Sequence, residues 1–93
     1  MNSFRIGIKM EVYKITAYSF PKNNKIKEFA HSTLFLTREF AHTTALALYS
    51  KKEFAQVWIS KASVNAQNTT QVDPTKCAWV LDTYITEVEL NPK

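Results

Sequence analysis

The stretch that decides the fold is TREFAHTTALALYSKK, residues 37–52, because it alone has a clean helical period. Thr37 is a good N-cap, and its hydroxyl is expected to accept a hydrogen bond from the amide of Glu39 or Phe40. Glu39 in the first turn and Lys51 and Lys52 in the last turn complement the helix dipole. One stripe of the helix is rich in small side chains and is expected to face a sheet: Phe40, Ala41, Thr44, Ala45 and Leu48. The opposite side is expected to carry Arg38, Glu39, His42, Leu46 and Ser50.

The first twenty residues alternate like a strand, but in two phases. Apolar residues occupy the even positions from Phe4 to Val12 and the odd positions from Tyr13 onward. Because a slip of one residue exchanges the faces of a strand, we expect a bulge or break near Val12–Tyr13. In a second interpretation, Met10 is the start of the chain proper and residues 1–9 are a loosely attached N-terminal extension.

The other apolar segments indicate strands on both sides of the helix. The sequence PKNNK, residues 21–25, is typical of a turn, and residues 26–36 follow as a second strand, with a helical turn at 25–31 as the alternative. Residues 53–64 and 76–90 are the clearest strands, and a polar loop, residues 65–75, separates them. Residues 91–93 are expected to form a short tail.

The order strand–strand–helix–strand–strand predicts a single α+β domain over residues 1–93, with a largely antiparallel four-stranded sheet and one helix on one face. The crossover through the helix should make the second and third strands parallel, whether they are adjacent or separated by another strand.

Composition narrows the class of protein. No apolar run approaches the roughly 20 residues that span a bilayer, and the N-terminus contains no signal-peptide core, so we expect a cytoplasmic protein without membrane contact. The single cysteine, Cys77, excludes an internal disulfide. The net charge of +4 comes from ten lysines and only two arginines, which disfavours sequence-specific reading of duplex DNA.

Residues with catalytic potential are few. A single glycine leaves no phosphate-binding loop, and no paired-cysteine or hydrolase motif is present. His31 and His42, with Glu39 as a third group, give a weak pattern for a metal, and Cys77 has no histidine near it in the sequence. We therefore predict a protein that is not an enzyme and that uses no cofactor and no metal.

Both faces of the predicted sheet carry large apolar side chains. In the last strand Trp79, Leu81 and Ile85 are expected on one face, and Val80 and Tyr84 on the other. In the third strand, Phe54 and Trp58 are expected to oppose Val57 and Ile59. One helix covers only one face of a sheet, and an exposed apolar face usually marks a partner surface.

We therefore predict a small protein-interaction module that forms a homodimer, binds and inhibits a larger protein, or does both. A phage or mobile-element protein that acts on a host or defence factor in the host cytoplasm would suit its size and charge. The predicted contacts are the exposed sheet face and the 65–75 loop, with some of the lysines: Tyr18, Trp58, Trp79, Tyr84, Asn68, Thr69, Gln71, Lys22, Lys25 and Lys27.

The alternative is a protein that binds single-stranded nucleic acid. Tyr13, Tyr18, Tyr84 or a tryptophan would then stack on bases. The phosphates would be followed by lysines from several segments: Lys14, Lys22, Lys25, Lys27 and Lys61.

Overall fold

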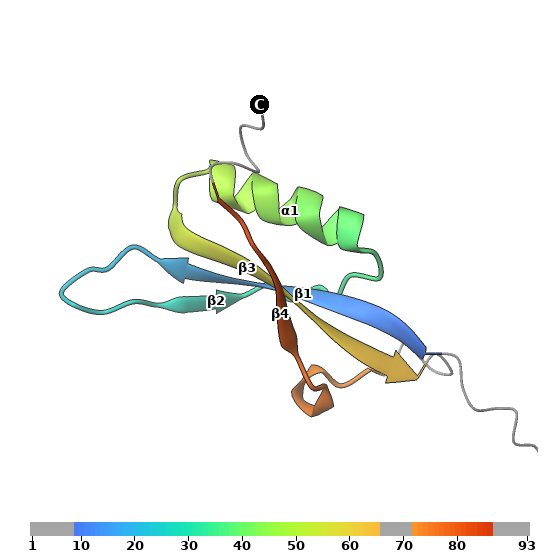
Figure 1. Cartoon of the computed structure of the whole chain (residues 1–93). Coiled ribbons are helices and arrows are strands. Elements are labelled where there is room, and N and C mark those ends of the chain that lie inside the picture. The colour runs from blue at the N-terminus through green and yellow to red at the C-terminus, as the bar shows by residue number, and fades with distance from the viewer. Residues whose placement is uncertain (1–8, 66–71, 87–93) are drawn as a thin grey trace, which may run out of the picture.

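The computed structural model describes residues 9–65 and 72–86, which form a four-stranded antiparallel sheet with one helix against one face (Figure 1). The elements are β1 (Lys9–Ser19), β2 (Glu28–Ala30), α1 (Arg38–Ser50), β3 (Phe54–Asn65), the 3₁₀ helix η3 (Pro74–Lys76) and β4 (Val80–Tyr84). This arrangement confirms the predicted α+β fold and the order of its elements.

The strand order in the sheet is β2-β1-β3-β4. Strand β1 is antiparallel to both of its neighbours, so β2 and β3 run parallel to each other with β1 between them. The parallel relation predicted from the crossover is therefore confirmed, in its separated form. The two edges of the sheet are the three-residue β2 and the five-residue β4.

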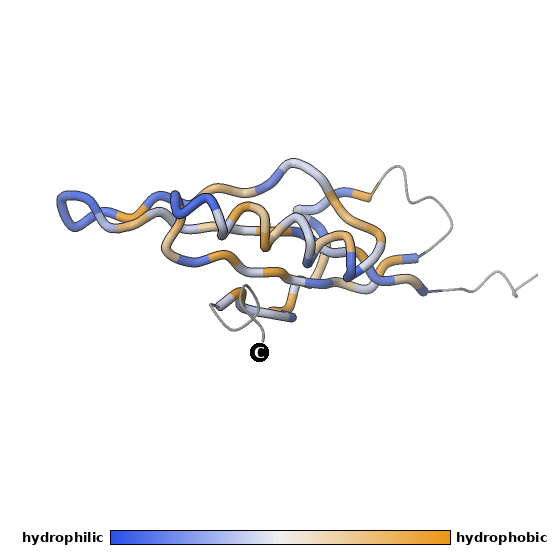
Figure 2. The backbone as a smooth tube through the Cα atoms, turned by 90° about the horizontal axis from the view of Figure 1, so that it is seen from above, coloured by the Kyte–Doolittle hydropathy of each residue, from blue (hydrophilic) through white to orange (hydrophobic). Residues whose placement is uncertain are grey.

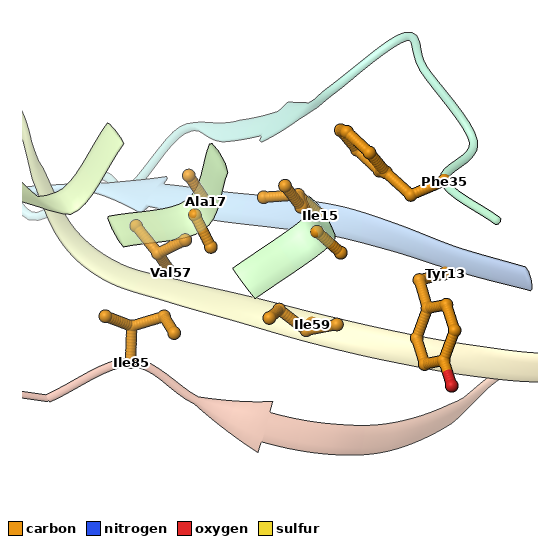
Figure 3. Packing of buried hydrophobic residues seen from close by; sticks show 9 residues of the cluster. Tyr13, Ile15, Ala17, Phe35, Val57, Ile59 and Ile85 are labelled. Carbon is orange, nitrogen blue, oxygen red and sulfur yellow. The ribbon is translucent and has the colours of Figure 1, made fainter. Parts of the chain in front are cut away.

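Helix α1 begins as its sequence predicts. The Thr37 hydroxyl accepts a hydrogen bond from the Phe40 amide at 3.1 Å. Ala41 and Ala45 have no exposed surface and belong to one core cluster with side chains of the sheet. Figure 3 shows Ile15, Val57 and Ile59 of this cluster. Because alanine adds only a methyl group, the helix backbone lies close to β1 and β3.

Two details of the predicted helix stripe are wrong. Phe40 is 63 % exposed: it is in the first turn of the helix, and its ring packs edge-to-face against the Phe35 ring, with centroids 5.4 Å apart, instead of entering the core. Leu46, expected on the solvent side, packs partly against the core.

Strand β1 does not break at Val12–Tyr13, which corrects the bulge expected there. Its pairing with β3 runs without a shift from Lys9–Asn65 to Tyr18–Gln56. The apolar residues shift from even to odd positions because both faces of the strand are buried over residues 12–17, apart from the half-buried Lys14. Apolar side chains are therefore suited to either face. Residues 1–8, most of the predicted extension, lie outside the described residues.

The second strand is shorter than predicted, and the alternative helical turn at 25–31 is also wrong. Only Glu28–Ala30 pairs continuously with β1, and Phe35 then forms an isolated bridge with Tyr13. Between them the chain turns locally, where His31 Nδ1 accepts a hydrogen bond from the Thr33 amide at 3.1 Å. That local hydrogen bond replaces the strand pairing.

Two bulges decide which face several side chains occupy. Ala55 has no partner in the β1–β3 pairing, and Asp82 has none in the β3–β4 pairing. The first bulge places Phe54 beside the core on the helix side instead of on the Trp58 face. The second separates Ile85, which is buried in the core, from Leu81, and places Leu81 with Tyr84. The predicted faces of Phe54, Ile85 and Tyr84 are therefore wrong.

The last strand is shorter than the predicted 76–90. Asp73 caps η3 by accepting a hydrogen bond from the Thr75 amide, and Pro74 starts this turn, so pairing begins only at Val80. Residues 87–93 lie outside the described residues.

The close approach of α1 to the sheet gives a stability prediction. Ala45→Leu forces three extra carbons into a filled core and should lower the free energy of unfolding by about 1–3 kcal/mol. Ala47→Leu, on the exposed side of the same helix, is the matched control and should change it by less than about 0.5 kcal/mol. Urea unfolding followed by circular dichroism measures both, and equal losses would contradict the packing described above.

Candidate interaction surface

The face of the sheet opposite α1 is defined by residues that alternate with the core residues. Since Ile15, Ala17, Val57 and Ile59 face the helix, their neighbours along each strand face away from it. We call this surface the open face. On β1, β3 and β4 it comprises Met10, Val12, Lys14, Thr16, Tyr18, Gln56, Trp58, Ser60, Ala62, Val64, Leu81 and Tyr84.

Three aromatic rings form a row across the open face, one from each of β1, β3 and β4. The Tyr18 and Trp58 ring centroids are 5.3 Å apart, and those of Trp58 and Tyr84 are 5.0 Å apart in an edge-to-face arrangement. Trp58 Nε1 also donates a hydrogen bond to Gln56 Oε1 at 3.2 Å. Tyr84 is 45 % exposed and the other two rings are half-buried. The row is therefore a firmly held apolar surface that still meets solvent.

The segment after η3 lies against another part of the open face. Lys14 Nζ lies 4.8 Å from the centroid of the Trp79 ring, and Trp79 Nε1 donates a hydrogen bond to the Pro74 carbonyl at 2.8 Å. The cation on this part of the face is thus already in contact with an aromatic ring. Leu81, which is 50 % exposed, lies between Trp79 and Tyr84 along the chain and faces the same side.

The structure brings together part of the residue set predicted from the sequence. Tyr18, Trp58 and Tyr84 meet in the aromatic row, and Trp79 lies on the same face. The predicted Lys22, Lys25 and Lys27 lie elsewhere, along the β1–β2 hairpin. Asn68, Thr69 and Gln71 lie outside the described residues.

Two features of this surface could not be predicted from the sequence. The contact of Lys14 with Trp79 joins segments that are distant in the chain, and no local pattern signals it. The sequence predicts Leu81 on the same face as Trp79, but the bulge at Asp82 that also brings Tyr84 to this face cannot be detected from the alternation of apolar residues.

On the opposite side of β4, a polar network ties the sheet edge to the start of α1. Arg38 Nε donates to Asp82 Oδ2 at 2.9 Å, and Arg38 Nη2 donates to Thr83 Oγ1 at 2.7 Å. The bulge lets Asp82 and Thr83 face the same side, so one guanidinium reaches both. Lys61 Nζ lies 3.8 Å from Asp82 Oδ1 and 4.0 Å from Glu11 Oε2.

This network shifts the pKa of Asp82. Burial of the carboxyl group, whose side chain is only 12 % exposed, acts to raise its pKa. Hydrogen bonds from Thr83 and Arg38, with the positive charges of Arg38 and Lys61, outweigh that effect, and the pKa lies below its usual value. The pKa of Tyr13 is raised, first by burial and then by its hydrogen bond to Glu11.

The described residues offer few other groups that could bind a metal or take part in catalysis. Within residues 9–65 and 72–86, no three His, Cys, Asp or Glu side chains lie together as a metal site would require. His31 is half-buried, with its ring near those of Phe29 and Phe35, and Cys77 is half-buried with its thiol 3.6 Å from the Asp73 carbonyl. In the same part of the chain, no helix combines the length and the apolar character needed to cross a bilayer.

Comparisons of the chain with protein-family models, with curated proteins and with solved structures find no significant match.

The Asp82 network predicts a pH-dependent stability. A carboxyl whose pKa is lower in the folded protein than in the unfolded chain stabilises the fold above its ordinary pKa, near 4, and this contribution disappears as pH falls through the folded value. Asp82→Asn should therefore lower the free energy of unfolding at pH 7 by about 1 kcal/mol, with a smaller loss toward pH 3.

Urea unfolding between pH 3 and pH 7 measures this difference. Glu53→Gln, at an exposed carboxylate that belongs to no ion pair of the network, is the control and should unfold like the parent protein throughout. A loss for Asp82→Asn that stays constant with pH would contradict the role given to its charge.

Proposed function

We propose that this protein is a non-enzymatic interaction module and that it forms a twofold dimer through its open face. The observation that carries the proposal is the row of Tyr18, Trp58 and Tyr84 on the face that α1 leaves uncovered. Aromatic side chains are enriched at the centres of protein interfaces, where charged residues are depleted.

The charge of the open face favours contact with a second copy. Across β1, β3 and β4 its only charged residue is Lys14, whose ammonium group lies over the Trp79 ring. The whole chain carries a net charge of +4, so two copies repel each other unless the contact keeps most lysines apart. A nearly neutral face meets that requirement.

The polar groups of the open face are also compatible with self-pairing. A twofold interface places the same patch on both partners, so its groups must complement themselves. Ser60 and Gln56 carry a hydroxyl and an amide group, each of which can both donate and accept hydrogen bonds. A face dominated by carboxylates or by ammonium groups would lack this property.

Strand β4 offers a matched pair of substitutions for testing the dimer. Leu81 and Val80 are 50 % and 55 % exposed, but Leu81 lies on the open face and Val80 on the helix side. In a twofold dimer through the open face, Leu81→Lys places one added charge from each copy in the interface and should weaken dimerisation at least tenfold. Val80→Lys adds the same charge outside the interface and should leave dimerisation unchanged.

Light scattering after gel filtration, over loading concentrations from about 1 to 200 µM, measures this difference. The parent protein and Val80→Lys should move toward twice the monomer mass as concentration rises, and Leu81→Lys should remain monomeric. A parent protein that stays monomeric throughout would refute the dimer. If a larger protein from a lysate then bound the parent and Val80→Lys but not Leu81→Lys, the open face would be a contact for a different partner.

A further inference from the structure

The β1–β2 hairpin extends beyond the end of the helix as a narrow two-stranded arm (Figure 1). Asn23 and Asn24 form its tip with φ values of 56° and 63°, the left-handed pair that a tight two-residue turn requires. Lys22 and Lys25 exchange backbone hydrogen bonds of 2.9 and 3.0 Å across the turn. The arm is therefore held in one geometry by its own turn.

Positive charge is concentrated at this end of the molecule. Lys22, Lys25 and Lys27 are all exposed, and no acidic residue lies between Phe20 and Lys27. Figure 2 shows the hydrophilic tip of the arm well beyond the helix.

Two further lysines lie at the same end of the sheet. Lys51 and Lys52 directly follow α1, and the chain then enters β3 at Phe54, which pairs with Ser19 at the base of the arm. Five of the ten lysines thus lie at this end, and the acidic residues next to them in sequence are Glu28 and Glu53.

The arm also carries apolar side chains beside its lysines. A concavity of about 460 Å³ runs along it, lined by Ser19, Phe20, Lys22, Asn23, Lys25 and Lys27. Phe20 is 54 % exposed and Ile26 is 59 % exposed, and neither belongs to the core cluster. An exposed aromatic side chain surrounded by lysines can stack on an uncharged nucleic-acid base, while the lysines attract the negatively charged phosphates of the same strand.

From these features we infer that the β1–β2 arm binds single-stranded nucleic acid, with Lys22, Lys25 and Lys27 at the phosphates and Phe20 stacked on a base. Lysines attract phosphates without reading base edges, which suits a strand bound with little sequence preference. The Asn23 side chain in the concavity adds an amide that can donate or accept hydrogen bonds.

The arm is a better site for a single strand than the aromatic surfaces considered from the sequence. Tyr13 is only 8 % exposed, and the rings of Tyr18, Trp58 and Tyr84 contact one another. Lys14 lies over Trp79, and Lys61 lies near Asp82 and Glu11. Those cations are already engaged within the chain, whereas Lys22, Lys25 and Lys27 line an open concavity.

Fluorescence anisotropy with labelled 20-nucleotide dT and U strands tests the inference. With three to five phosphate contacts, the dissociation constant should rise roughly 20- to 130-fold between 50 and 200 mM salt. Lys22→Gln with Lys25→Gln should reduce the slope of log affinity against log salt by about 1.4. The matched control, Lys9→Gln with Lys76→Gln, removes the same charge from exposed lysines outside the arm and should leave the slope unchanged.

Phe20→Ala should weaken binding of the single strand by roughly 5- to 150-fold, and Phe20→Leu should recover only a small part, because leucine offers no ring for stacking. No binding by the parent protein at 50 mM salt would overturn the inference, as would equal effects of the two lysine pairs. Tighter binding of a 20-base-pair duplex would overturn the choice of a single strand. Equal affinity for polyglutamate, unaffected by Phe20→Ala, would assign the arm to an acidic protein surface instead.

Discussion

The packing of Ala41 and Ala45 against the centre of the sheet is the contact on which the other features depend. Both methyl groups lie fully buried in one cluster with Ile15, Val57 and Ile59. Because the helix lies so close to the sheet, this one helix is enough to cover one face of β1 and β3. The Arg38–Asp82 pair then attaches β4 to the start of the same helix. All of these contacts lie on one side of the sheet, so the aromatic side chains of the other side remain available.

The resulting molecule has two different surfaces in two different places. The open face is nearly neutral and aromatic, and the β1–β2 arm is basic and projects from one end. An interface between copies and a site for a polyanion have opposite charge requirements, since the first must avoid repulsion and the second needs excess positive charge. Separation of the two surfaces would let both activities coexist in one small chain.

The sequence was informative where local chemistry dominates. Thr37, the alanine stripe and the crossover rule predicted the helix start, its buried side and the parallel relation of β2 and β3. It failed where pairing between distant segments decides the outcome. The bulges at Ala55 and Asp82 moved Phe54 and Ile85 to the helix side, and simple alternation cannot reveal an unpaired residue. The sequence predicted that tyrosines and tryptophans would form the contact surface. It could not predict which of them lie side by side, because the bulges decide which face each side chain occupies.

In our proposal, copies of this protein meet through the face that the helix leaves uncovered. Acrylamide quenching of Trp58, in a Trp79→Phe variant that leaves it as the single tryptophan, tests this claim most directly. Because Trp58 lies at the middle of the aromatic row, its quenching should fall steadily as protein concentration rises from about 1 to 200 µM. Quenching that stays the same across that range while the protein dimerises would place the interface on another surface and contradict the claim.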